Sequence, residues 1–420
     1  MSVRSFVAGG LLIVCCASLA QVEVTPIISF ILDDSADSPQ RGEFSATRRA
    51  PVERTNQTGC WDEDGNTIDC ADTGQDGEYQ AGVPWPDPRF IDNGDGTVLD
   101  QLTGLVWLKD GTCLTSTSGI AQVANTLASG QCGLTDGSAT GDWHVPTINE
   151  LISLVDFGTL SGDLPAGHPF TLPTPATFNN VYLSSTYQVR SSSSSLVSYL
   201  TLDLDTNRLV STNRLLSVHN QVNSVLYVLA VRHRNPATGN YHLFESTAGA
   251  PVQMTEQRTC LNTADRRWRN CRGFNTDGEF QWGIAFPEPR FVDNRDGTVT
   301  DRLTGLVWMT DFECLTGLAT SQKWEDALTT ANGFSDGDCG VSDGSSAGDW
   351  RLPNVNELIS IHDAKSIYYQ SAILGLEFPR LWTSTTRPDQ TENAFATEPS
   401  VLRSESKDVT FIDFILVRDP

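Results

Sequence analysis

Short apolar runs separated by turns rich in Gly and Asp make up most of the chain. The segments 89–91 and 97–99 flank the turn Asn93-Gly94-Asp95-Gly96, a β-hairpin pattern in which glycine supplies the positive φ of a tight turn. Residues 105–108 follow Thr103-Gly104 and predict the next strand. The pattern therefore predicts a core of short antiparallel strands.

Helical periodicity occurs between these strand-like segments. The segment 323–331 carries apolar residues at the spacing of one helix face: Trp324, Ala327, Leu328 and Ala331. A second helix is expected where Thr147 and Glu150 fit a capping box ahead of an apolar stripe, and Asn354 and Glu357 form a similar pair downstream. Since strands and helices do not alternate as βαβ units, the expected fold class is α+β.

The chain contains an internal repeat. The block at 86–108, PDPRFIDNGDGTVLDQLTGLVWL, returns at 287–309 as PEPRFVDNRDGTVTDRLTGLVWM. The period is far longer than that of solenoid repeats, so two globular domains are expected rather than a stacked array. We place copy one at 59–234, a linker at 235–254 and copy two at 255–420, each with short strands, two helices and its own core.

Residues 1–20 have the pattern of a secretory signal peptide. Arg4 supplies a basic start, residues 6–16 an apolar stretch, and Ala20 ends a small-residue cleavage site. A lipid anchor at Cys15 or Cys16 is the less favoured alternative. Residues 21–58 are expected to be a spacer, and no later segment is long enough to cross a membrane. The protein is thus expected to be exported, to the periplasm, the cell surface or the medium.

Four cysteines remain in each copy, and an even number in an exported chain predicts disulfides. They are Cys60, Cys70, Cys113 and Cys132 in copy one, and Cys260, Cys271, Cys314 and Cys339 in copy two. Several pairings are open; the loop lengths, which differ between copies while their flanks hold, favour sequence neighbours. A zinc site built from these cysteines is disfavoured because no Cys-x-x-Cys or paired His accompanies them.

The formal net charge of −24 argues against a nucleic-acid partner, which would need clustered Lys and Arg. It also disfavours anionic polysaccharides. One local exception is a candidate anion-binding loop with four arginines: Arg266, Arg267, Arg269 and Arg272. The matching loop of copy one, between Cys60 and Cys70, is acidic.

The repeated Asp-rich turns are candidate calcium sites as well as hairpin turns. The residues are Asp92, Asp95 and Asp100 in copy one, and Asp293, Asp296 and Asp301 in copy two. Their spacing does not match an EF-hand, since no bidentate Glu follows at the twelfth position. Turn geometry accounts for the same residues and is the favoured interpretation, so no cofactor is expected.

Candidate catalytic residues are few. Glu150 and Glu357 recur, but their position at a helix start favours a capping role. Histidines do not recur: His144 corresponds to Arg351 in the other copy. Because a nucleophile built into the module would need its base in both copies, no catalytic residue is assigned.

The recurrent aromatic residues are expected in the core: Trp107, Trp143, Phe90 and their counterparts Trp308, Trp350 and Phe291. Trp61 and Trp85 occur in one copy only, and an aromatic ring of this kind can stack on a sugar.

The strings DGTVTDRLTGLVWM, GDWRLPNVNELIS and LWTSTT resemble the Lcl C-terminal domain family of exported bacterial domains, named after a collagen-like adhesin. The resemblance covers nearly all of both copies. It implies a C-type-lectin-like fold, related to that of formylglycine-generating enzymes. The family's adhesin binds sulfated glycans and supports attachment. The enzyme's catalytic cysteine pair and the Glu-Pro-Asn and Trp-Asn-Asp motifs of C-type lectins are absent from this sequence, so the fold is expected to carry over, not the ligand.

Together these features predict an exported, disulfide-stapled binding protein with two C-type-lectin-like modules and no enzymatic activity. Its expected partner is a surface polysaccharide or another cell-surface component. The alternatives are a structural or assembly role in the cell envelope without a sugar ligand and, third, an enzyme with one active copy.

Overall fold

The computed structural model of the chain describes most residues after position 48. The described ranges are 49–116, 122–159, 164–173, 181–188, 198–203, 216–220, 226–233, 249–262, 267–274, 276–311, 314–315, 322–361, 380–398 and 401–420. The predicted signal peptide 1–20, most of the spacer 21–58 and most of the linker 235–254 lie outside them. In the described ranges no helix is both long and apolar enough to cross a membrane.

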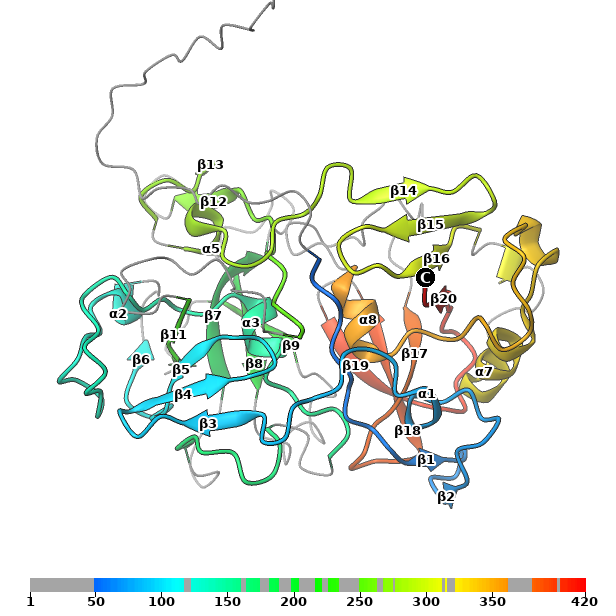
Figure 1. Cartoon of the computed structure of the whole chain (residues 1–420), viewed down its shortest axis with the longest axis horizontal. Helices are drawn as coiled ribbons and strands as arrows, with labels where there is room; N and C mark the ends of the chain where they lie inside the picture. Colours follow the sequence, from blue (N-terminus) through cyan, green and yellow to red (C-terminus); the bar gives the residue numbers. More distant parts are fainter. Residues whose placement is uncertain are drawn as a thin grey trace, which may run out of the picture. The chain divides into compact units, whose positions relative to one another are not determined.

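Each copy contains the same four-stranded antiparallel sheet (Figure 1). In copy one it consists of β3 (Phe90–Asp92), β4 (Thr97–Asp100), β5 (Val106–Leu108) and β11 (Val231–Arg232). In copy two it consists of β14 (Phe291–Asp293), β15 (Thr298–Asp301), β16 (Val307–Met309) and β20 (Val417–Arg418). The predicted hairpins are confirmed, and the last strand of each copy pairs with the strand that carries the buried tryptophan, Trp107 with Val231 and Trp308 with Val417.

Each copy also contains a second sheet, which includes the Ser/Thr-rich segment. In copy two it is antiparallel: β17 (Leu381–Thr386), β18 (Asn393–Glu398) and β19 (Val401–Ser406). In copy one the strand order is β6 (Thr115–Ser116), β10 (Leu226–Tyr227), β7 (Val181–Gln188), β8 (Ser198–Asp203) and β9 (Leu216–Asn220). Strands β10 and β7 are parallel, and the other pairs in this sheet are antiparallel.

The predicted helices are present. They are α2 (Gln122–Asn125) and α3 (Ile148–Ile152) in copy one, and α7 (Trp324–Gly333) and α8 (Val355–Ser360) in copy two, where the 3₁₀ turn η1 (Asp338–Gly340) also occurs. Both predicted capping boxes are confirmed: Thr147 and Asn354 accept the backbone N–H of Glu150 and Glu357, whose carboxylates accept the N–H of the cap residue in return. The mixed α+β content is therefore confirmed.

Two further one-turn helices, α1 (Asp76–Tyr79) and α5 (Asp277–Phe280), were not expected. A single turn is too short to show helical periodicity, so the apolar pattern contains no signal for it. Each lies after a two-stranded hairpin, β1–β2 (Cys60–Trp61 and Thr67–Ile68) or β12–β13 (Thr259–Asn262 and Arg267–Asn270).

The recurrent residues build the core. The side chains of the four recurrent tryptophans are fully buried: Trp107, Trp143, Trp308 and Trp350. Arg89 makes a bidentate ion pair with Asp100 and also donates to the carbonyl of Ser153. In copy two the same contacts join Arg290 to Asp301 and to the carbonyl of Ser360. The repeated block is thus scaffold, tied to the C-terminal end of the neighbouring helix, α3 or α8.

Four disulfides staple the described chain. They join sequence neighbours, as the loop lengths favoured: Cys60–Cys70, Cys113–Cys132, Cys260–Cys271 and Cys314–Cys339. Each closes a loop of 10 to 25 residues. In the chain-entropy view such a bridge adds about 3 kcal/mol to the free energy of unfolding by restricting the unfolded chain.

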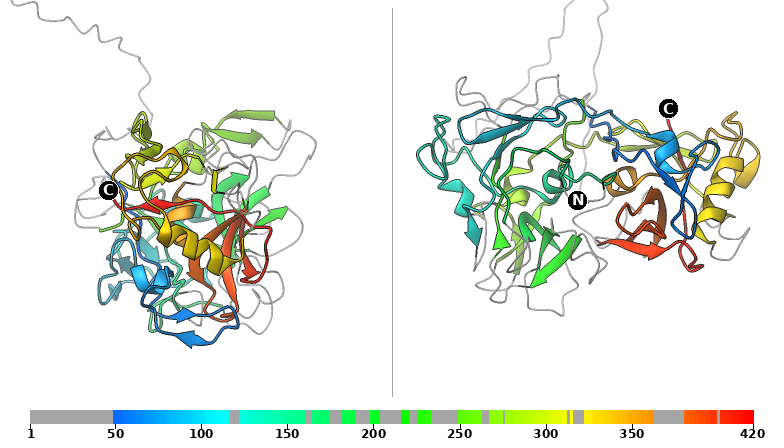
Figure 2. Two further views of the ribbon diagram at one scale, coloured as in Figure 1. Left: turned by 90° about the vertical axis from the view of Figure 1, so that its right-hand side faces the viewer. Right: turned by 90° about the horizontal axis from the view of Figure 1, so that it is seen from below.

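The segment that precedes each four-stranded sheet packs against the other copy. We call residues 49–84 the first leader and 249–284 the second leader, and residues 89–233 and 290–420 body one and body two. Gln57 of the first leader makes two hydrogen bonds with the backbone of Thr386 in β17, and α1 contacts that strand. Figure 2 shows the blue first leader beside the orange and red strands of body two.

The second leader makes the equivalent contacts with body one. Asn149 of α3 donates to the carbonyl of Gln253, just as Asn356 of α8 donates to the carbonyl of Glu53. Helix α5 contacts β7. The leaders are therefore exchanged between the two bodies, which the sequence repeat could not reveal because a repeat identifies copies without saying which segments touch.

Candidate functional site

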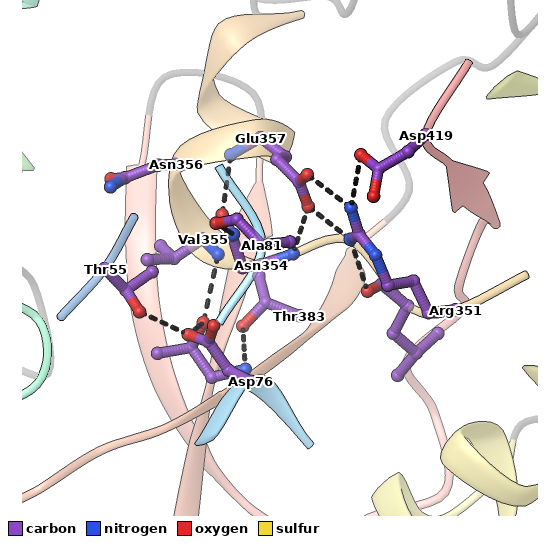
Figure 3. Close-up of polar contacts among 12 residues, drawn as sticks. Thr55, Asp76, Ala81, Arg351, Asn354, Val355, Asn356, Glu357, Thr383 and Asp419 are labelled. Carbon is purple, nitrogen blue, oxygen red and sulfur yellow. Dashed lines mark hydrogen bonds and ion pairs between the residues drawn. The ribbon is translucent and has the colours of Figure 1, made fainter. Parts of the chain in front are cut away.

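The glutamate at the start of α8 is the centre of a buried ionic cluster in copy two (Figure 3). Arg351 donates from Nη1 and Nη2 to the two carboxylate oxygens of Glu357, over 2.6 and 2.7 Å. Glu357 also accepts the backbone N–H of Asn354 at 2.9 Å. Asp419 lies 3.5 Å from the same guanidinium and is largely exposed. A bidentate pair of this kind gives a buried carboxylate both an opposite charge and two directed hydrogen bonds.

The glutamate at the start of α3 has different neighbours at the same positions. His144 replaces Arg351, and its backbone pairs with Val231 as that of Arg351 pairs with Val417. His144 Nε2 lies 3.2 Å from both carboxylate oxygens of Glu150. His233, which replaces Asp419, makes a short hydrogen bond to Glu150 through Nε2. Copy one therefore gathers two imidazoles around the carboxylate.

An aromatic ring from the second leader covers this group. Trp282 stacks on His144 and His233 with ring centroids 4.6 and 5.1 Å apart, and the two imidazoles also stack at 5.1 Å. The first leader has Ala81 at the matching position, where its carbonyl accepts from Asn354. The indole ring and both histidines thus belong to copy one's site alone.

Burial sets the protonation of this group. Burial lowers the pKa of His144 despite the nearby carboxylate, which favours its neutral form at neutral pH. Burial alone would raise the pKa of Glu150, but the contacts to His144 and His233 outweigh it and hold that pKa well below its ordinary value. The Glu150 carboxylate is therefore ionised beside the two imidazole rings.

These three side chains are the potential metal-ligand cluster in the described part of the chain. One ligand atom from each of His144, Glu150 and His233 lies within 4.8 Å of the others. Imidazole nitrogens and a carboxylate oxygen are donors that zinc and related ions accept.

The candidate calcium residues do not converge. Asp92 pairs with Lys109, Asp95 accepts from Thr97 in the turn, and Asp100 pairs with Arg89. The copy-two residues behave alike, since Asp293 and Asp296 accept backbone N–H groups in the turn and Asp301 pairs with Arg290. Turn geometry and ion pairing explain all six, and none of the three-residue sets forms a ligand cluster in the described chain.

The acidic loop of copy one is described in full, whereas the arginine-rich loop of copy two is described only in part. The acidic loop between Cys60 and Cys70 docks on body two, where buried Lys407 donates to the carbonyls of Trp61 and Asp62 at 2.9 and 3.1 Å. Burial lowers the pKa of Lys407 to about 8. Arg272 of the candidate anion-binding loop is exposed, whereas Arg266 and the side chains of Arg267 and Arg269 lie outside the described residues.

A buried carboxyl group marks each leader–body junction. Asp76 accepts hydrogen bonds from Thr55 and from Thr385 of body two, both at 2.7 Å. Asp277 accepts from Thr255 and, at 2.7 Å, from Thr186 of body one. Burial raises the pKa of Asp76 to about 6 and that of Asp277 to about 7. These two residues recur in the sequence, yet nothing in the local pattern shows that their partners lie in the other copy.

A pocket lies where both leaders meet α3 and α8. Its walls include Val52, Val252, Ile152 and Ile359, with the amide side chains of Asn356 and Gln253 among its polar residues. In the described chain the buried oxygens Asn356 Oδ1 and Gln253 Oε1 have no hydrogen-bond partner.

Trp85 and Trp61, the aromatic candidates of copy one, both have protein contacts. Trp85 donates from Nε1 to the carbonyl of Arg54 and lies 4.3 Å from the Arg89 guanidinium. Trp61 belongs to the acidic hairpin that docks on body two. Sequence comparison flagged His144 as copy-specific, but missed His233 and Trp282 because they join it only through the fold.

The chain matches the Lcl C-terminal domain over residues 96–232 and 297–410. No curated protein and no solved structure matches it. The two matched segments contain the capped helices, the second sheets and part of each four-stranded sheet, since β3, β14 and β20 lie outside them. Together they cover more than half of the sequence. The chain therefore belongs to the Lcl C-terminal domain family and carries two copies of its domain.

Proposed function

We propose that this protein is an exported, non-enzymatic binding module whose ligand is a surface polysaccharide, with two C-type-lectin-like bodies as the scaffold. The four disulfides support export, because disulfides form and persist in oxidising compartments. The family membership supports a domain that acts at the bacterial surface.

The roles of the recurring carboxylates support binding rather than catalysis. Asp100 and Asp301 are held by arginines, and Glu150 and Glu357 cap helices. An acid–base mechanism present in both copies would need a recurring pair of carboxylates near each other with one free to exchange protons. These four groups instead stabilise the fold. Asp76 and Asp277, the recurring carboxyls whose pKa burial raises, are buried at the leader junctions and accept hydrogen bonds from threonines.

The observation that carries the proposal is the pocket between the leaders. Asn356 Oδ1 and Gln253 Oε1 are buried acceptors without donors in the described chain, and leaving such groups unpaired costs about 1–3 kcal/mol each. Sugar hydroxyls are donors, and Val52, Ile152 and Ile359 give this small pocket apolar walls against which one edge of a sugar, such as a hydroxymethyl group, can pack. The net charge of −24 favours a neutral glycan over a sulfated one.

A glycan array tests this proposal. The full chain is screened on neutral and sulfated glycans, with calcium and with chelator, and then as the variant Gln253→Leu. We expect binding to a neutral glycan that chelator does not abolish and that Gln253→Leu weakens about tenfold, since one hydrogen bond is lost. Gln131→Leu, at an exposed glutamine that also makes a local hydrogen bond, is the matched control and should bind normally. Absence of binding to every glycan contradicts the proposal.

The leader exchange favours a second candidate function, assembly within the cell envelope. Each leader docks on a body other than its own through paired contacts such as Asn149–Gln253 and Asn356–Glu53. The same contacts can join modules from separate chains. Light scattering across a range of concentrations tests this: assembly predicts dimers or larger species that grow with concentration, whereas a chain that stays monomeric at every concentration contradicts it.

A further inference from the structure

We propose that His144, Glu150 and His233 form a binding site for one divalent transition-metal ion, zinc by donor chemistry, in copy one alone. This inference is independent of the glycan proposal, because it concerns a different group of residues and is tested without any sugar.

The distances suit a shared ion. His144 Nε2 lies 3.2 Å from each oxygen of Glu150, and His233 Nε2 approaches the same carboxylate. Two ligands at about 2.0–2.1 Å from a tetrahedral zinc ion lie roughly 3.3 Å apart. The three donor atoms therefore need only small side-chain rotations to point at one ion.

The carboxylate is already held in position by its capping role. Glu150 Oε2 accepts the backbone N–H of Thr147 at 2.7 Å, and Glu150 is fully buried. An outer hydrogen bond of this kind fixes the orientation of a metal-binding carboxylate and leaves the other oxygen for the ion. Oε1 is the oxygen that faces both His144 and His233.

Comparison with copy two supports a cation beside Glu150 in copy one. Glu357 occupies the same helix position and is neutralised by the guanidinium of Arg351. In copy one the side chains that contact the Glu150 carboxylate are two imidazoles and not a guanidinium, so a bound dication would supply the positive charge that Arg351 supplies in copy two. Arg351 fills the space and offers donors only, so the copy-two site cannot bind a metal ion.

Trp282 closes the site from the second leader. Its indole ring stacks on both imidazoles, and the side chains of His144 and His233 are only 7% and 6% exposed. A dry site strengthens the attraction between the ion and its ligands. Metal binding would thereby also fasten the second leader to body one.

Titration of the tag-free full chain tests the proposal. After chelator treatment and dialysis, Zn²⁺ is added in a calorimeter at pH 7.5, and Co²⁺ is added while visible absorption is recorded. We expect one ion per chain, release of protons from the ligands, and cobalt bands of a low-coordinate nitrogen–oxygen site. Cobalt should also quench the fluorescence of the wild-type protein more than that of Trp282→Phe.

The matched control converts the copy-one site into its copy-two counterpart. His144→Arg/His233→Asp recreates the Arg–Glu–Asp cluster, which the same backbone already accommodates in copy two. We expect at least a ~100-fold loss of Zn²⁺ affinity with unchanged circular dichroism, since two ligands are removed. His233→Ala provides a second variant if the first fails to fold, with an expected loss of about tenfold or more. Wild-type protein that takes up no Zn²⁺ at millimolar concentration, or folded variants that bind as well as wild type, would overturn the proposal.

Discussion

At the start of α8, Glu357 pairs with the guanidinium of Arg351, which also lies near Asp419. At the start of α3, Glu150 contacts two imidazoles that stack on an indole ring. Both glutamates cap their helix in the same way and are fully or almost fully buried. The two copies thus share the capping geometry and differ in the side chains that surround the capping carboxylate. The proposed metal site lies where the copies differ, whereas the capping geometry that they share is needed to fold.

The largest expected effect comes from breaking the copy-two ion pair. Arg351→Met leaves Glu357 buried without its partner, which should lower the free energy of unfolding by about 4 kcal/mol. Arg351→Met/Glu357→Gln removes both charges, and glutamine can still complete the capping box, so at least half of the loss should return. Urea denaturation at pH 7 measures both. Equal losses in the single and double variants would show that the charge imbalance is not the cause.

The leader junctions give an effect of similar size, through pH. Asp277 and Asp76 bind a proton more tightly when folded, since burial raises their pKa to about 7 and about 6. The stability they add is therefore complete below pH 4 and is lost as the pH rises through those values. Across this window we expect Asp277 to account for a fall of about 4 kcal/mol in the free energy of unfolding, since burial raises its pKa from an ordinary value of about 4 to about 7.

Neutral variants sharpen the difference between the two junctions. Asp277→Asn should remove the part of the pH dependence that extends to about pH 7, whereas Asp76→Asn should remove a part that ends near pH 6. Both variants should be more stable than the wild type at pH 8. Urea denaturation between pH 4 and 8 measures this, and an Asp277→Asn profile that follows the wild type would contradict the assignment.

Much of the scaffold was predictable from local pattern. The hairpin of residues 89–99, the capping boxes at Thr147 and Asn354 and the pairing of neighbouring cysteines all depend on residues close in sequence. Such contacts leave a periodic or positional signal in the chain.

The candidate site could be predicted only in part, because its residues come from three distant segments. His144 stood out as copy-specific, but His233 lies 83 residues from Glu150 and Trp282 comes from the other copy's leader. The exchange of leaders depends on contacts such as Asp76 with Thr385, separated by 309 residues. A single sequence gives no information on such distant pairs, whereas helices, turns and caps can be predicted from residues that are neighbours in the sequence.

The smallest expected effect separates Trp282 from its copy-two counterpart, Ala81. Because Trp282 stacks on His144, a double-mutant cycle of Trp282→Ala and His144→Ala in the metal-free protein should give a coupling energy of about 1 kcal/mol. Ala81 carries no ring, so the cycle of Ala81→Gly with Arg351→Ala should show little coupling beyond experimental error. Urea denaturation of the single and double variants supplies both cycles. Coupling of equal size in the two copies would mean that the indole does not clamp the second leader, and that the leaders are held by their backbone contacts and buried aspartates alone.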